Sequence, residues 1–121
     1  MNIEYGWFLV AFSCMLNHEL DAVRTKEWRM IPLLDRLPDE LGYQIFTALH
    51  LPLFVALLVG FFGMADTRYN SALINGFNWF CLVHLGMHIL VRNHPNNQFH
   101  SIPSWIWIGG AAVAGALDLA L

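Results

Sequence analysis

Two histidines four residues apart give the strongest chemical signal in this sequence. His84 and His88 share one face of any helix that contains both, because positions i and i+4 stack above each other. In the first apolar run, polar residues also recur at helical spacing, at Cys14, Asn17, His18 and Asp21. Imidazole nitrogens combined with a carboxylate oxygen are typical ligands of Zn²⁺ and Fe²⁺. These patterns indicate a metal site built from more than one helix.

The composition favours a lipid bilayer as the solvent for the elements that carry these residues. Of 121 residues, 57% are hydrophobic and 12% are charged, whereas about a quarter of an average soluble domain is charged. This length holds about four spans of roughly 20 residues and leaves no room for a second domain. The net charge is −3 and the six basic residues form no exposed basic surface, so we expect no nucleic-acid partner.

Four long apolar runs predict an all-α protein, an antiparallel bundle of four transmembrane helices in one domain covering residues 1–121. The predicted spans are Tyr5–Val23, Leu41–Met64, Asn70–Arg92 and Ile102–Leu121. The longest connection, residues 24–40, contains two prolines and an amphipathic stretch, so we expect it to lie along the membrane interface.

The basic residues set the predicted orientation. Four of them lie in loop 24–40 and Arg92 begins the third connection, whereas Arg68 alone lies on the opposite side. By the positive-inside rule, the first and third loops are cytoplasmic and both termini are on the non-cytoplasmic side. We therefore predict a multi-pass protein of the bacterial inner membrane.

With this orientation, the buried histidines fall at one depth. His18, His50, His84 and His88 lie about four to nine residues from the cytoplasmic ends of their helices. At about 1.5 Å per residue, all four lie roughly 6 to 14 Å from that boundary. Asp118 falls at the outer end of the last helix and is not expected in this group. Taken singly, each histidine could instead form an interhelical hydrogen bond.

The predicted metal ligands are therefore His18, Asp21, His50, His84 and His88, and the predicted ion is Zn²⁺ or Fe²⁺. Asp21 and Glu19 are the predicted acid–base groups. Glu19 points about a third of a turn away from His18 on a helix, so it could alternatively support a ligand from behind or pair with a loop arginine.

Small residues dominate the last predicted helix, at Gly109, Gly110, Ala111, Ala112, Ala114, Gly115 and Ala116. Small side chains let two helices approach closely in a membrane. This face could pack within one chain or form a homo-oligomer, and the sequence leaves both open. Cys14 and Cys81 are read as small buried apolar residues.

The segment from Asn17 to Arg29, taken with His50 and the H-x-x-x-H of the third run, resembles uncharacterised small four-helix bacterial membrane-protein families. The site alone is similar to membrane zinc hydrolases of the alkaline ceramidase and adiponectin receptor superfamily. That resemblance implies that His84 and His88 are two ligands, that His18 or His50 is the third, and that Asp21 activates water. Those enzymes have seven helices, and their serine position would fall here to Ser13, Cys14 or Thr47.

Three functions are compatible with these residues. The first is a metal-dependent membrane enzyme, in which the ion lowers the pKa of water toward about 7 and Asp21 or Glu19 relays its proton during hydrolysis of a lipidic amide or ester. An iron redox enzyme would use the same ligands. The second is a haem or quinone protein with histidines on facing helices. The third is a non-enzymatic proton or ion carrier, or a partner subunit. Membrane lipids are expected partners in each case.

Overall fold

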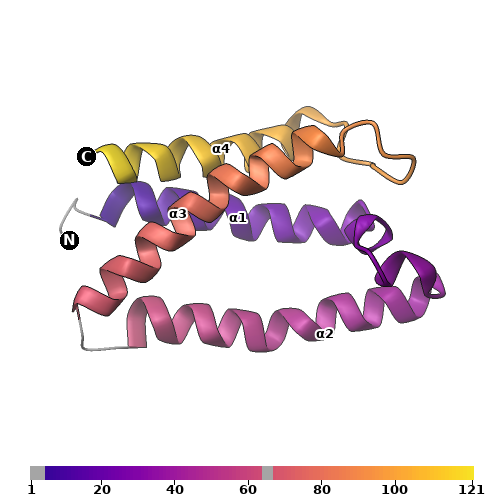
Figure 1. The fold of residues 1–121 in the computed structure, drawn as a ribbon, viewed down its shortest axis with the longest axis horizontal. Coiled ribbons are helices and arrows are strands. Elements are labelled where there is room, and N and C mark those ends of the chain that lie inside the picture. Colours follow the sequence, from indigo (N-terminus) through magenta and orange to yellow (C-terminus); the bar gives the residue numbers. More distant parts are fainter. Residues whose placement is uncertain (1–4, 64–66) are drawn as a thin grey trace.

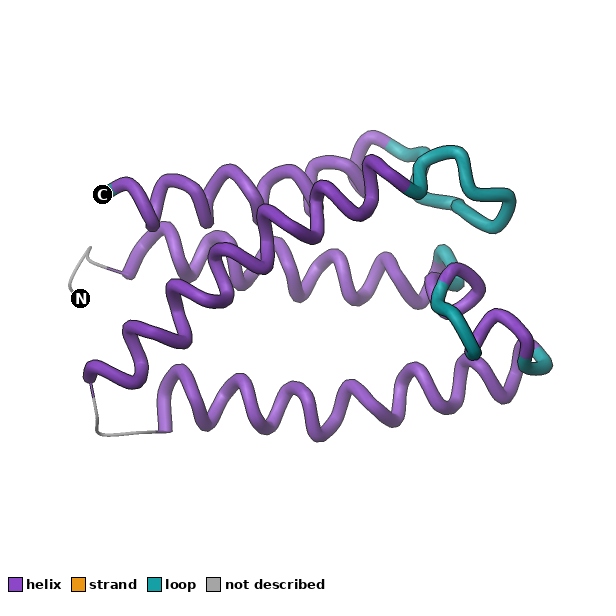
Figure 2. The backbone as a smooth tube through the Cα atoms, viewed as in Figure 1, coloured by secondary structure: helices purple, strands orange, loops and turns teal. Residues whose placement is uncertain are grey.

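The computed structural model describes residues 5–63 and 67–121, and this part of the chain is helical with no strand. The long helices are α1 (Gly6–Arg24), α2 (Asp39–Leu58), α3 (Thr67–Leu90) and α4 (Ile102–Ala120). A π-helical turn, η4 (Val59–Gly63), extends α2, and two short 3-10 turns, η2 (Glu27–Met30) and η3 (Leu34–Arg36), lie between α1 and α2 (Figure 2). The prediction of an all-α fold with four long helices is confirmed.

Three of the four predicted transmembrane helices meet the length and hydropathy expected of a membrane span. Segments Asp39–Gly63, Asn70–Leu90 and Ile102–Ala120 are long and apolar enough to cross a membrane, whereas α1 is not among the candidate spans. The physical reason lies in the second half of α1, where Asn17, His18, Glu19 and Asp21 lower its mean hydropathy. Some of these polar side chains lie inside the protein, since His18 is completely buried.

Helices α1, α3 and α4 pack together closely, while α2 stands apart from α1 over most of its length (Figure 1). Both described chain ends lie at one end of the molecule, and the connections 25–38 and 91–101 lie at the other (Figure 1). The C-terminal ends of α1 and α3 therefore meet at the loop end. His18, His84 and His88 all belong to this end.

The small residues of α4 are used for packing inside the chain. A Cβ atom added to Gly115 would lie 3.2 Å from the backbone oxygen of Asn78 on α3, and one added to Gly110 would lie 3.1 Å from Cys14 Sγ on α1. Ala111, Ala112 and Ala114 are also buried. The close approach of α4 to α1 and α3 thus depends on small residues at these positions of α4.

At the end opposite the histidines, Asp118 joins three helices. Its carboxylate accepts a hydrogen bond from the Phe8 backbone N–H at 3.0 Å and from Asn78 Nδ2 at 2.7 Å. The Phe8 amide belongs to the first turn of α1, whose N–H groups have no partner within the helix. Asp118 therefore satisfies polar groups of α1 and α3 from α4.

Replacing Gly115 with leucine should destabilise the protein by roughly 1–3 kcal/mol, because the new side chain meets the α3 backbone. Gly109→Leu is the matched control, since an added Cβ at that position has no neighbour within 4 Å. Thermal unfolding in detergent measures both variants. Equal melting temperatures for the two would contradict the packing of α4 on α3 described above.

Candidate metal centre

Three histidines and one glutamate converge at the loop end of the bundle. His18 comes from α1, His84 and His88 from α3, and Glu27 from η2. The exposed fractions of the three histidines are 0%, 8% and 4%. One ligand atom from each of the four residues lies within 4.8 Å of all the others. The group is therefore compact and largely shielded from solvent.

Helix geometry explains why the imidazoles meet. The four-residue spacing places the rings of His84 and His88 on one face of α3, with centroids 4.6 Å apart. The His18 ring packs against both, with centroids at 4.6 Å and 4.9 Å. Phe99, from the connection between α3 and α4, is 1% exposed and contacts His18 and His88, so it closes the group from the loop side.

The spacing of the ligand atoms suits a tetrahedral ion. With metal–ligand bonds of 2.0–2.1 Å, ligand atoms around tetrahedral zinc lie about 3.3 Å apart. Here the Nε2 atoms of His84 and His88 are 3.0 Å apart. Glu27 Oε1 lies 3.5 Å from His88 Nε2, and the other carboxylate oxygen, Oε2, lies 3.7 Å from His18 Nε2. These three distances lie near the tetrahedral value.

Several buried ring nitrogens lack hydrogen bonds. Within residues 5–63 and 67–121, neither His18 Nδ1, His18 Nε2 nor His84 Nδ1 has a hydrogen-bond partner. A buried polar group is normally paired, and exceptions call for an explanation such as a bound ion. The arrangement thus has both the donor atoms and the unmet bonding capacity of a metal site.

Glu27 carries the negative charge that such a site requires. Its burial acts to raise the pKa of the carboxyl, but the interaction with His88 and the charges of His18 and His84 outweigh this, and its pKa lies below the usual range. The group is therefore a carboxylate at neutral pH. A carboxylate among imidazoles offers the oxygen ligand that complements nitrogen donors on Zn²⁺ or Fe²⁺.

The position of Glu27 is set by anchors on the start of α2. The Asp39 carboxylate accepts hydrogen bonds from Lys26 at 2.8 Å, from Arg29 at 2.7 Å and from the Trp28 indole at 3.0 Å. The indole also packs on Gly42, where an added Cβ would lie 2.7 Å from Trp28 Cδ1. Because both neighbours of Glu27 are held by Asp39, η2 presents its carboxylate to the histidines.

The structure places two predicted ligands outside this group. The Asp21 carboxylate accepts hydrogen bonds from Arg24, at 2.9 Å, and from the Ser104 hydroxyl on α4. Asp21 therefore faces α4, while His18 faces α3. His50, on α2, contacts Glu19 instead of the other histidines. The structure brings together His18, His84 and His88 and adds Glu27, which the helix patterns did not indicate.

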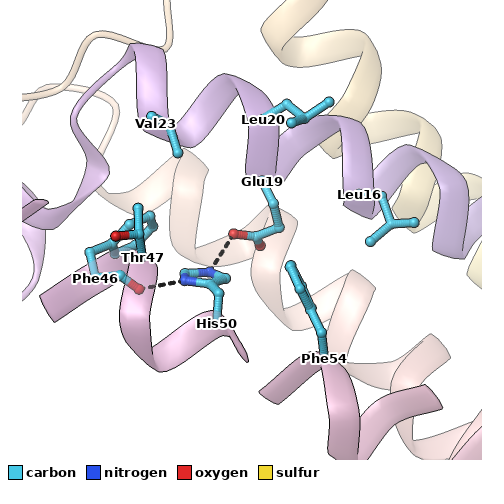
Figure 3. A pocket seen from close by; sticks show the side chains of 8 residues that line it. All are labelled: Leu16, Glu19, Leu20, Val23, Phe46, Thr47, His50 and Phe54. Carbon is cyan, nitrogen blue, oxygen red and sulfur yellow. Dashed lines mark hydrogen bonds and ion pairs between the residues drawn. The ribbon is translucent and has the colours of Figure 1, made fainter. Parts of the chain in front are cut away.

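Glu19 and His50 form a second polar unit between α1 and α2. His50 Nε2 lies 2.8 Å from Glu19 Oε2, and His50 Nδ1 lies 2.6 Å from the Phe46 carbonyl oxygen (Figure 3). A carbonyl can only accept, so Nδ1 carries a proton. Both nitrogens of the His50 ring are therefore engaged, one by the Phe46 carbonyl oxygen and one by the Glu19 carboxyl group.

This pair lies in a cavity of about 360 Å³ whose other lining is mainly apolar, with Leu16, Leu20, Val23 and Phe54 around it (Figure 3). A second cavity of about 360 Å³ also reaches Glu19 and shares Leu16 and Phe54 with the first. Glu19 follows His18, a member of the His/Glu group, directly in the chain. The polar pair thus lies beside the His/Glu group.

The packing of the imidazoles favours a bare ion over haem. A haem iron held by two histidines needs a flat slot for the porphyrin between the two rings. The rings of His18, His84 and His88 contact one another directly, so they leave no such slot. The haem alternative has no support from this geometry.

Fold and site together define an all-helical protein with three membrane-length helices and a buried His/Glu group. The profile of a family of unknown function, DUF6713, matches residues 5–121. The match covers nearly the whole chain, and the chain belongs to this family. No curated protein and no solved structure matches the chain. The predicted resemblance to uncharacterised families is thereby supported, whereas no membrane-hydrolase family is found.

Asp39→Asn should loosen the segment that carries Glu27, because the ion pairs with Lys26 and Arg29 are lost. Tryptic cleavage after Lys26 and Arg29 should then become several-fold faster than in the parent protein. Asp35→Asn is the control, since this exposed aspartate lies in the same connection and none of the hydrogen bonds or ion pairs found in residues 5–63 and 67–121 involves its side chain. Equal cleavage rates for the two variants would refute the anchoring role of Asp39.

Proposed function

We propose that this chain is an integral membrane protein that binds one divalent transition-metal ion, Zn²⁺ or Fe²⁺, between α1, η2 and α3. The observation that carries the proposal is the buried His18 imidazole, whose two nitrogens lack hydrogen bonds within the described residues while three further ligand groups surround it. An unsatisfied buried polar group costs about 1–3 kcal/mol. A bound ion would take one of these two nitrogens as a ligand, remove that part of the cost and link three elements.

The proposed location is the inner membrane, with the metal centre near the cytoplasmic face. Arg24 ends α1, and Lys26, Arg29 and Arg36 lie in the connection 25–38, at the end of the molecule that also holds the His/Glu group (Figure 1). The positive-inside rule assigns this end to the cytoplasm. Both termini would then lie on the other side of the membrane.

A second candidate function, metal-dependent hydrolysis of a lipidic ester or amide, is favoured by the Glu19/His50 pair in its apolar cavity. Hydrolysis adds water across the acyl C–O or C–N bond, with hydroxyl going to the acyl carbon and a proton to the leaving oxygen or nitrogen. A bound ion supplies Lewis acidity. In this function Glu19, the residue after His18 in the chain, would accept and return the proton. Asp21 is less suited, because Arg24 and Ser104 occupy its carboxylate.

The metal proposal predicts about one equivalent of zinc or iron in protein purified from metal-supplemented cells. His84→Ala and His88→Ala should each lose it in elemental analysis. Removal of a group that merely supports a ligand lowers metal affinity about 10–100-fold, and loss of a ligand lowers it further. Glu27→Ala should weaken binding in the same assay.

Asp21→Asn and His50→Ala are the matched controls and should retain the metal, because both side chains point away from the group. Circular dichroism verifies that each variant is folded. A metal-free parent protein would refute the proposal. Metal loss in His50→Ala, together with full retention in Glu27→Ala, would instead favour the ligand set expected from sequence.

The orientation is tested by cysteine labelling in intact cells. Asp35→Cys lies in the connection between α1 and α2, and Leu121→Cys lies at the opposite end, where Leu121 is 89% exposed. A membrane-impermeant maleimide should label position 121 from outside and position 35 only after permeabilisation. The reverse pattern would invert the proposed orientation.

A further inference from the structure

We propose that the groove between α1 and α2 binds a single-chain lipid whose neutral polar head is held by the Glu19/His50 pair. This inference deepens the proposed function and rests on it, because the groove gains its chemical role from the metal centre beside it. The molecule expected in the groove, next to the metal centre, is a lipid with one acyl chain and an uncharged head containing ester, amide or hydroxyl groups.

The shape of the groove supports a long, narrow occupant. The cavity around Glu19 and His50 is followed along α1 by cavities that share Leu16 and Phe54 with it and that include Phe12. From Val23 to Phe12, this lining spans twelve residues of α1, a rise of about 16 Å at about 1.5 Å per residue step. Such a length accommodates most of an extended acyl chain lying parallel to the helices.

The residues around the groove are apolar and exposed to the bilayer, which favours a hydrocarbon chain as its occupant. On one side it is bounded by α2, which belongs to the most apolar candidate span of the chain, with mean hydropathy 2.3. Leu20, at the rim beside Glu19, is 73% exposed, and Leu49 and Leu51 on α2 are 60% and 70% exposed. In a bilayer these side chains meet lipid tails, so a lipid can enter the groove sideways without crossing water.

The polar pair indicates what kind of head group fits. Glu19 and His50 are only 21% and 19% exposed and are almost the sole polar groups in an apolar cavity. Both His50 nitrogens are already occupied, one by the Phe46 carbonyl oxygen and one by Glu19, so the pair offers no free cation for a phosphate. The nearby cations are already engaged, since Arg24 pairs with Asp21 and both Lys26 and Arg29 pair with Asp39. Uncharged ester, amide and hydroxyl groups can form hydrogen bonds with the pair without bringing an unpaired charge into the apolar cavity.

The test uses a photoreactive N-acylethanolamine, a neutral single-chain lipid with a diazirine in its acyl chain, added to the purified full-length protein. Labelled peptides identified by mass spectrometry should map to the groove faces of α1 and α2. Leu16→Trp fills the region that the cavities share and should reduce labelling to background. Leu49→Trp is the control, since Leu49 lines none of these cavities, and it should label like the parent protein.

Two further measurements separate this inference from the proposed function. Metal content is determined in the same samples, and His84→Ala, which removes a ligand, should still be labelled because His84 does not line the groove. A phosphate-headed lysolipid that bears the same diazirine should label more weakly. Equal labelling of Leu16→Trp and Leu49→Trp in metal-containing protein would overturn the lipid groove alone. Groove labelling of a metal-free parent protein would overturn only the metal centre.

Discussion

The need to satisfy one fully buried imidazole organises the loop end of this protein. His18 lies inside the bundle with no exposed surface, against two histidines of α3 and the glutamate of η2. A polar group in that position must find a partner or destabilise the fold. The neighbouring side chains are of types that can bind a metal, so an ion shared by the whole group would provide a partner for one of the two His18 nitrogens. The contacts of η2 with α2 position the Glu27 carboxylate, which would balance part of the positive charge of that ion.

Helix α1 shows how the rest of the structure adapts to this constraint. Its second half is too polar to be a candidate span, and three of its polar side chains face three different helices. His18 faces α3, Glu19 faces α2 and Asp21 faces α4. At its other end, Asp118 accepts the Phe8 amide. The helix is therefore polar on several sides, and the neighbouring helices contact His18, Glu19 and Asp21.

The hydrophobic periodicity of the sequence and the distance of each histidine from its helix end were sufficient to predict the helices and the convergence of three histidines. The i, i+4 spacing of His84 and His88 fixes their shared face, and the parallel course of α1 and α3 places His18 at the same level. The rotation of α1 about its axis could not be predicted, because Cys14, Asn17, His18 and Asp21 form a face wide enough to border two helices. Asp21 therefore meets Ser104. His50 has the predicted depth, but α2 stands apart from α1. His50 therefore contacts Glu19 of α1 and does not reach the other histidines.

Glu27 escaped prediction because it lies in a short 3-10 turn, where no hydrophobic period reports the direction of a side chain. Its position depends on Asp39, twelve residues further along the chain, and on a left-handed backbone at Lys26, with φ of 53°. The signal that was available is chemical. A single carboxylate among Lys26, Trp28 and Arg29 interrupts a basic interfacial stretch next to the buried histidines, and such an isolated charge marks a candidate partner.

The most direct test of the central claim is X-ray absorption at the metal edge of the purified protein. A site formed by His18, His84, His88 and Glu27 predicts nitrogen and oxygen neighbours at about 2.0–2.1 Å, with the outer-shell scattering of about three imidazole rings. Glu27→Ala should keep the imidazole signal and lose one near neighbour. Sulfur at about 2.3 Å, or a spectrum without imidazole scattering, would contradict this account.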